Sequence, residues 1–283
     1  MKQRIRFWLG TVVVALFVGI ALMPAISVPA NAIDRTADAV WINRGGGRNA
    51  DGSDGLRARF NAPEQVVYAG AAHLCCQNES GNWGWGVSIG DTSMSFGFGL
   101  TSSTWTSVEI LAWSGSVTFE SDQNTTDTGD AYVLMRYTKV TGTFNDPVNG
   151  PTDIKHEFDR EIFYTYPNNY YTEKITARIT EDNKEVRIYK GGKAAPGGST
   201  QSTAARFDTP IRSIAEVGTT SNFVIGIRDV PTSQMSSVFI GNPDDINPYW
   251  NGRAYADFTA TGAHDGGISA YWGLGTHSGV YSV

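Results

Sequence analysis

Aromatic residues are the side chains of this sequence whose types and spacing best suit ligand binding. Trp83 and Trp85 stand two positions apart among glycines, so in a strand they would share one face. Four tyrosines surround a polar turn at an expected strand end: Tyr164, Tyr166, Tyr170 and Tyr171. Exposed flat rings stack on the apolar faces of sugars, so these six residues predict a carbohydrate site. Core packing is the commoner role of such side chains and stays the alternative.

Catalytic residue types occur in the sequence without the spacing of a catalytic site. His156 and Arg160 would share one face of a strand, where they could act as the base and the cation of a polysaccharide lyase. No His-x-x-x-His or His-Glu-x-x-His spacing is present for zinc. We therefore predict no catalytic residues and keep a lyase-like enzyme as an alternative.

Two clusters of oxygen-bearing side chains are candidates for a calcium-binding site. Residues 49–55 combine Asn, Asp and Ser with turn glycines, but the later bidentate Glu of an EF-hand is missing. Asn242, Asp244 and Asp245 form a second, weaker cluster. Turn chemistry alone explains both, because Asn, Asp and Gly suit tight turns. The sequence predicts no cofactor and leaves calcium open.

The N-terminus predicts export from the cytoplasm. Lys2, Arg4 and Arg6 precede an apolar run over residues 7–23, and Ala-Asn-Ala at residues 30–32 matches a signal-peptide cleavage pattern. We expect residues 1–32 to be removed and the mature protein to be secreted or associated with the cell envelope. An uncleaved N-terminal anchor is the alternative, and no later segment is apolar enough to cross a membrane.

The only two cysteines, Cys75 and Cys76, are adjacent. An oxidising compartment disfavours two permanently free thiols. Consecutive Cα atoms lie about 3.8 Å apart, which is below the usual disulfide range of about 4.4–6.8 Å. Three states stay open: a strained vicinal disulfide that floors a small binding site, a bridge to a second chain, and a buried reduced pair.

The charge balance limits the partners of the mature chain. The first 32 residues hold three of the 22 basic residues and none of the 28 acidic ones, so 19 basic residues face 28 acidic ones, a net charge of −9. Nucleic acids and anionic lipids both need clustered Lys and Arg, so neither is expected as a partner. A glycan or another envelope component fits better, and the oligomeric state is left open.

Strand patterns recur along the sequence, whereas helical patterns do not. Ile175, Ala177 and Ile179 alternate with polar residues. Residues 186–189 alternate again after a polar turn, which predicts a β-hairpin with one buried face. The sequence thus predicts an all-β fold.

A single domain is expected after the signal peptide. We expect residues 33–60 to form a less ordered N-terminal segment and residues 61–283 to form the β domain. Residues 107–120 and 154–166 each predict one long strand, and residues 212–217 are the only candidate for a helical turn.

Three glycine-rich segments carry a family resemblance. They are Gly-Trp-Gly-Val at residues 84–87, a hairpin and loop over residues 187–199, and a closing strand over residues 265–275. In this order they resemble a supersandwich-type β domain of bacterial secreted and cell-surface proteins of unassigned function. The resemblance implies a large antiparallel β-sandwich. Lys193 and Thr200 replace two acids of the family loop, so no carboxylate site is expected there.

These observations together predict a non-enzymatic secreted or cell-surface β-sandwich that binds carbohydrate or another envelope component. A lyase-like polysaccharide-active enzyme is one alternative. A structural subunit of a surface assembly, linked through Cys75 or Cys76, is the other.

Overall fold

The computed structural model describes residues 39–61, 64–74, 83–90, 92–96, 105–122, 126–180, 184–199, 201–209, 211–221, 223–231, 233–245, 254–276 and 279–282. The predicted signal peptide, Cys75 and Cys76 lie outside these ranges. Within them, no helix has the length and apolar character needed to span a membrane.

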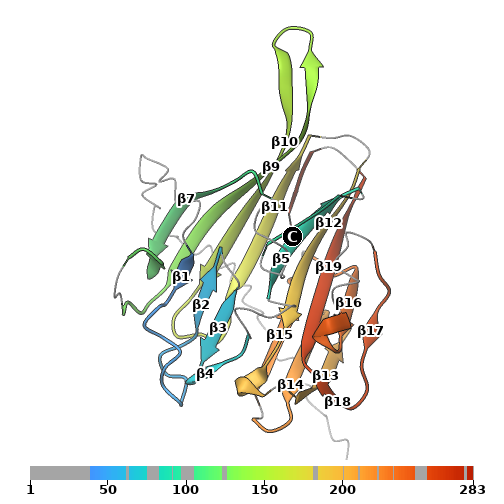
Figure 1. The fold of residues 1–283 in the computed structure, drawn as a ribbon. Coiled ribbons are helices and arrows are strands. Elements are labelled where there is room, and N and C mark those ends of the chain that lie inside the picture. Colours follow the sequence, from blue (N-terminus) through green and yellow to red (C-terminus); the bar gives the residue numbers. More distant parts are fainter. Residues whose placement is uncertain are drawn as a thin grey trace, which may run out of the picture.

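The described chain is built from strands, which confirms the all-β prediction. Its strands form four sheets, called I to IV here (Figure 1). Sheet I has the order β4 (Ala71–Ala72), β3 (Gln65–Tyr68), β2 (Arg57–Phe60), β1 (Val40–Ile42), β8 (Val117–Phe119). Sheet II has the order β20 (Gly279–Ser282), β11 (Thr172–Ile179), β10 (Gly150–Tyr164), β9 (Ala131–Asp146), β7 (Ser107–Gly115).

The other two sheets hold the remaining strands. Sheet III has the order β17 (Phe258–Thr259), β16 (Ser237–Ile240), β19 (Gly267–Thr276), β12 (Glu185–Lys193), β5 (Gly84–Ile89), β6 (Thr92–Phe96). Sheet IV has the order β15 (Val224–Arg228), β14 (Ser213–Gly218), β13 (Gln201–Phe207), β18 (Ala263–Asp265). All neighbours pair antiparallel except β16 and β17, which pair in parallel.

The structure is not one large antiparallel sandwich. The supersandwich fold that the resemblance implies is therefore wrong as well. The four small sheets are arranged in a ring that resembles a four-bladed β-propeller. A strand of a simple two-layer sandwich alternates between a buried and a solvated face. In β5 and β16, by contrast, every residue is buried. Sheet III is therefore covered on both faces along these strands. The large core joins it to sheets I and II, and the small core joins it to sheet IV.

The predicted hairpin around residues 180–185 is also wrong, although its alternation is right. Ile175, Ala177 and Ile179 are buried as expected. However, β11 pairs with β10 and β20 in sheet II, whereas β12 pairs with β19 and β5 in sheet III. Alternation identifies the buried face of a strand but says nothing about its partner.

Three further expectations change in the structure. Residues 107–120 divide between β7 in sheet II and β8 in sheet I. Gly115 lies at the division with a φ of +69°, and a Cβ there would lie 2.0 Å from the carbonyl oxygen of Asp130. Residues 212–217 contribute to strand β14 rather than a helical turn. The segment expected to be less ordered supplies β1 and β2, because Val40, Ile42 and Phe60 are buried in the core.

The described residues form one large hydrophobic core and two smaller clusters. The large core joins apolar side chains of sheets I, II and III, the small core joins sheet III to sheet IV, and the third cluster joins Tyr189, Phe239 and Tyr271 of sheet III. Away from all three, β9 and β10 project beyond the rest of the fold as a two-stranded ribbon (Figure 1). Its tip is closed by Asp146, whose Oδ1 accepts hydrogen bonds from the backbone N–H groups of Val148 and Asn149.

Candidate ligand-binding cavity

A cavity with a volume of about 900 Å³ is lined by all four sheets. Its lining includes Val66 and Tyr68 of sheet I, Glu173 and Ile175 of sheet II, Ile188, Lys190 and Trp272 of sheet III, and Ile225 and Ile227 of sheet IV. Most of these side chains are apolar or aromatic. The cavity therefore exists because four sheets meet, and no local segment of the sequence encodes it.

Three of the six predicted aromatic residues line this cavity. They are Trp83, Tyr170 and Tyr171. Tyr170 is 60% exposed, so its ring is accessible from solvent. Tyr171 packs edge-on against Phe60, with ring centroids 5.2 Å apart.

The other three predicted aromatic residues lie outside the cavity lining. Trp85 is fully buried and stacks on Trp105 with ring centroids 5.4 Å apart. Tyr164 is buried, and its hydroxyl donates to the carbonyl oxygen of Asn168 at 3.1 Å. Tyr166 is partly exposed, and its hydroxyl donates to the carbonyl oxygen of Ser53 at 3.4 Å. Trp83 and Trp85 do not share one face of a strand, because Trp83 precedes β5 and packs in the small core, whereas Trp85 lies in β5 and packs in the large core.

One end of the cavity, defined here by Glu173 and Lys190 of its lining, adjoins a cluster of four charged residues. This cluster, called the tetrad, joins buried Glu64, Arg160 and Lys190 to Glu173, whose side chain is 13% exposed. Arg160 donates to Glu64 at 2.7 Å and to both carboxylate oxygens of Glu173 at 2.9 Å. Lys190 donates to Glu64 at 2.7 Å and to Glu173 at 2.8 Å. The tetrad joins two cations and two anions, so it is neutral as a unit.

The protonation of the tetrad follows from this arrangement. Burial raises the pKa of Glu173, but the charges of Arg160 and Lys190 and their hydrogen bonds outweigh it and lower the pKa to about 2. The stability that this carboxylate contributes is present above its ordinary pKa of 4.5 and is lost as the pH falls toward 2. Burial lowers the pKa of Arg160, but the two glutamates raise it well above its ordinary value.

A positional signal in the sequence marks part of the tetrad. Arg160 stands between Phe158 and Ile162 on the inward face of β10, and Lys190 follows Ile188 on the same face of β12. A charged residue at an inward position of an alternating strand needs a buried partner. Glu64 precedes β3 and carries no such signal, so sequence reasoning misses it.

His73 lines the cavity as a neutral imidazole. Its Nδ1 accepts a hydrogen bond from the backbone N–H of Gly197 at 3.0 Å, and its Nε2–H donates to the carbonyl oxygen of Tyr68 at 3.0 Å. Its ring also meets that of Phe223 edge-on at 4.9 Å. Burial lowers the pKa of His73 below its ordinary value, and the hydrogen bond to Tyr68 opposes this in part.

We expect His73 to make the protein less stable in mild acid. The unfolded chain takes up the proton near pH 6.5 and the folded chain only at lower pH, so stability falls as the pH drops below 6.5. One such proton changes the free energy of unfolding by at most about 1.4 kcal/mol per pH unit. Urea unfolding between about pH 7.5 and about pH 5 measures this loss. In His73→Gln, whose amide oxygen can still accept from Gly197, the loss should be smaller, and equal losses would refute the assignment.

The residues considered for catalysis do not form a catalytic site in the structure. His156 is fully buried, and its Nδ1 accepts from the backbone N–H of Thr180 at 3.3 Å. Arg160 is committed to the tetrad. Residues 86–90 have the Gly-x-Ser-x-Gly spacing of a nucleophile elbow, which sequence reasoning overlooked. Ser88 nevertheless lies inside β5, fully buried against Tyr189, and not at an exposed strand-to-helix turn.

The loop considered for calcium uses carboxylate oxygens for its own turn. Asp54 Oδ2 accepts from the backbone N–H groups of Arg48 and Asn49 at 2.7 and 3.0 Å, and Asp51 accepts from Ser53. Among the described residues, no group of three or more His, Cys, Asp or Glu side chains is arranged to hold a metal ion.

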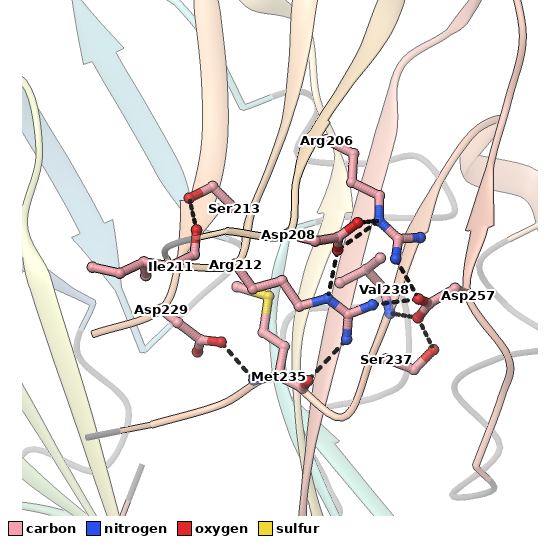
Figure 2. Close-up of polar contacts among 10 residues, drawn as sticks. All are labelled: Arg206, Asp208, Ile211, Arg212, Ser213, Asp229, Met235, Ser237, Val238 and Asp257. Atoms are coloured by element: carbon pink, nitrogen blue, oxygen red, sulfur yellow. Dashed lines mark hydrogen bonds and ion pairs between the residues drawn. The ribbon is translucent and has the colours of Figure 1, made fainter. Parts of the chain in front are cut away.

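A smaller pocket of about 450 Å³ shares part of its lining with the cavity, including Asp229 and Val230. Figure 2 shows the polar contacts beside it. Arg206 and Arg212 each pair with both Asp208 and Asp257. These charges neutralise one another and tie Arg206 and the segment between β13 and β14 to Asp257 and Met235, beside the smaller pocket that Asp208 and Arg212 line.

Comparisons with protein-family models, curated proteins and solved structures find no match to this chain. The resemblance to supersandwich-type proteins therefore stays a prediction, although the sandwich fold that it implies is wrong.

Proposed function

We propose that this protein is a non-enzymatic binding protein, secreted or held at the cell surface, that encloses a small ligand in the cavity between its four sheets. The observation that carries the proposal is the cavity itself. Its volume of about 900 Å³ lies within the range of about 300–1,000 Å³ that is common for ligand sites. A largely apolar lining with a small number of polar groups is typical of such sites.

The lining favours a compact ligand with a large apolar surface. The rings of Trp83, Tyr170 and Trp272 and the side chains of Ile225 and Ile227 line the space. A carbohydrate derivative or another envelope component with an apolar face would meet this requirement. Since Trp85 is fully buried, the walls of the cavity offer the aromatic contacts instead of the Trp83–Trp85 pair.

Binding is better supported than catalysis at this site. Glu173 and Lys190, which line the cavity, are held by Arg160 and Glu64 in the tetrad. The Nδ1 of His73 already accepts from Gly197, and Asp229 accepts from Met235 and Trp272. A general base must reach the proton that it removes, and Glu173 already accepts from Arg160 and Lys190.

Nile red, a neutral and largely apolar dye, tests the proposal. We expect the mature protein to bind one dye molecule with a rise and a blue shift of its fluorescence. Ile227→Trp adds bulk to the cavity wall and should weaken binding by about tenfold or more. Val148→Trp adds a similar ring at the tip of the β9–β10 ribbon, where Val148 is exposed, and should leave binding unchanged. Absence of binding, or equal binding by both variants, would refute the proposal.

A further inference from the structure

We infer that the cavity selects a neutral ligand that carries a hydrogen-bond acceptor, a carbonyl or hydroxyl oxygen, and places that oxygen at the end formed by Trp83 and Lys190. This inference rests on the proposed function, because it describes the ligand of the same cavity. Both residues line the cavity, and the backbone of Trp83 adjoins the tetrad, since its carbonyl oxygen accepts from the backbone N–H of Glu64, whose carboxylate accepts from Lys190.

The first observation is an unused donor on Trp83. This side chain is 97% buried and lines the cavity. Among the described residues, no acceptor lies within hydrogen-bond distance of its indole N–H. Burying a donor without a partner is costly, so a group that can accept from it is expected in the functional state.

The second observation is the remaining donor of Lys190. An ammonium group has three N–H donors. Two of them are directed to Glu64 and Glu173, which leaves the third without an acceptor in the part of the chain that the structure describes. Lys190 lines the cavity together with Glu173.

The acceptors at this end are already engaged. Both carboxylate oxygens of Glu173 accept from Arg160, and one of them accepts from Lys190 as well. The wall at this end therefore has donors to offer and its nearest carboxylate is satisfied. A ligand that brings an acceptor complements it, and a ligand that brings only a donor does not.

The charge balance of the tetrad favours a neutral group at this end of the cavity. Its two cations already balance the two carboxylates. An anionic group placed here would be one charge in excess, beside the carboxylate of Glu173. A buried charge without a counterion is strongly unfavourable, whereas a neutral carbonyl or hydroxyl oxygen can accept the same hydrogen bonds.

Three naphthalene probes that share one ring system test the inference on the mature protein. Prodan carries a propionyl ketone, 6-propyl-2-(dimethylamino)naphthalene has a methylene in place of its carbonyl, and 6-(dimethylamino)-2-naphthoate has a carboxylate in place of the propionyl group. We expect prodan to bind about tenfold more tightly than each of the other two, the effect of about one added hydrogen bond. In Trp83→Phe this preference should fall to about threefold or less. Trp85→Phe makes the same change in the core and should keep the preference.

The outcomes separate the two proposals. If prodan and the ketone-free probe bind the wild-type protein equally, the acceptor is not selected, although the cavity still binds. If the carboxylate binds most tightly, the preference for a neutral ligand is wrong. If no probe binds, the proposed function itself fails. The wild-type comparison alone decides these points, so they stay testable even if Trp83→Phe does not fold.

Discussion

Replacing Arg160 by methionine is expected to lower the free energy of unfolding by about 3–5 kcal/mol. Arg160 is fully buried and is bound by both glutamates of the tetrad. Its removal would leave Glu64 and Glu173 to share Lys190, with one negative charge uncompensated in the interior. Methionine fills much of the same volume, so the loss measures charge and hydrogen bonding more than packing. Urea unfolding at neutral pH gives the value.

Arg178→Met is the matched control for this change. The Arg178 side chain is 38% exposed and pairs with Asp159, which keeps a second partner in Arg136. Exposed ion pairs contribute little, so the control should lose about 1 kcal/mol or less. Similar losses in the two variants would show that the tetrad contributes no more to stability than a surface ion pair.

Replacing Trp85 by alanine is expected to destabilise the protein by about 3–5 kcal/mol. The ring of Trp85 stacks on Trp105 and meets Tyr137 edge-on, with centroids 4.8 Å apart for the second pair. It also lies beneath Arg160, whose guanidinium carbon is 5.7 Å from the ring centroid. Truncation would open a cavity in the large core and remove these contacts together. Thermal and urea unfolding both report the loss.

Phe144→Ala is the control for this second change. Phe144 lies on the β9–β10 ribbon and is 48% exposed, so its truncation should change stability by about 0.5 kcal/mol or less. If Trp85 were instead a ligand-stacking residue, Trp85→Ala would abolish binding while leaving the unfolding midpoint near that of the wild type. That result would contradict the burial of this ring.

Local patterns of the sequence predicted strand character and buried faces correctly. Ile175, Ala177 and Ile179 are buried as their alternation requires, because successive side chains of a strand point to opposite faces whatever its partner is. The same local rule cannot choose between neighbours, and so β11 and β12 were wrongly paired. It also cannot show that a strand such as β5 is covered on both faces.

The candidate site was only partly predictable for a related reason. Trp83 and Trp85 have the same residue type and similar neighbours, yet one lines the cavity and the other packs in the large core. Their difference depends on which sheets cover each ring, and this is not encoded within a few residues of either.

The sequence by itself determined an all-β chain with recognisable inward faces and a set of aromatic residues suited to ligand contact. The tertiary structure alone decided the ring of four sheets, the cavity at their junction and the tetrad beside it. The physical reason is distance along the chain. Arg160 and Lys190 reach Glu64 across 96 and 126 residues, respectively, and such contacts form only once the sheets have packed.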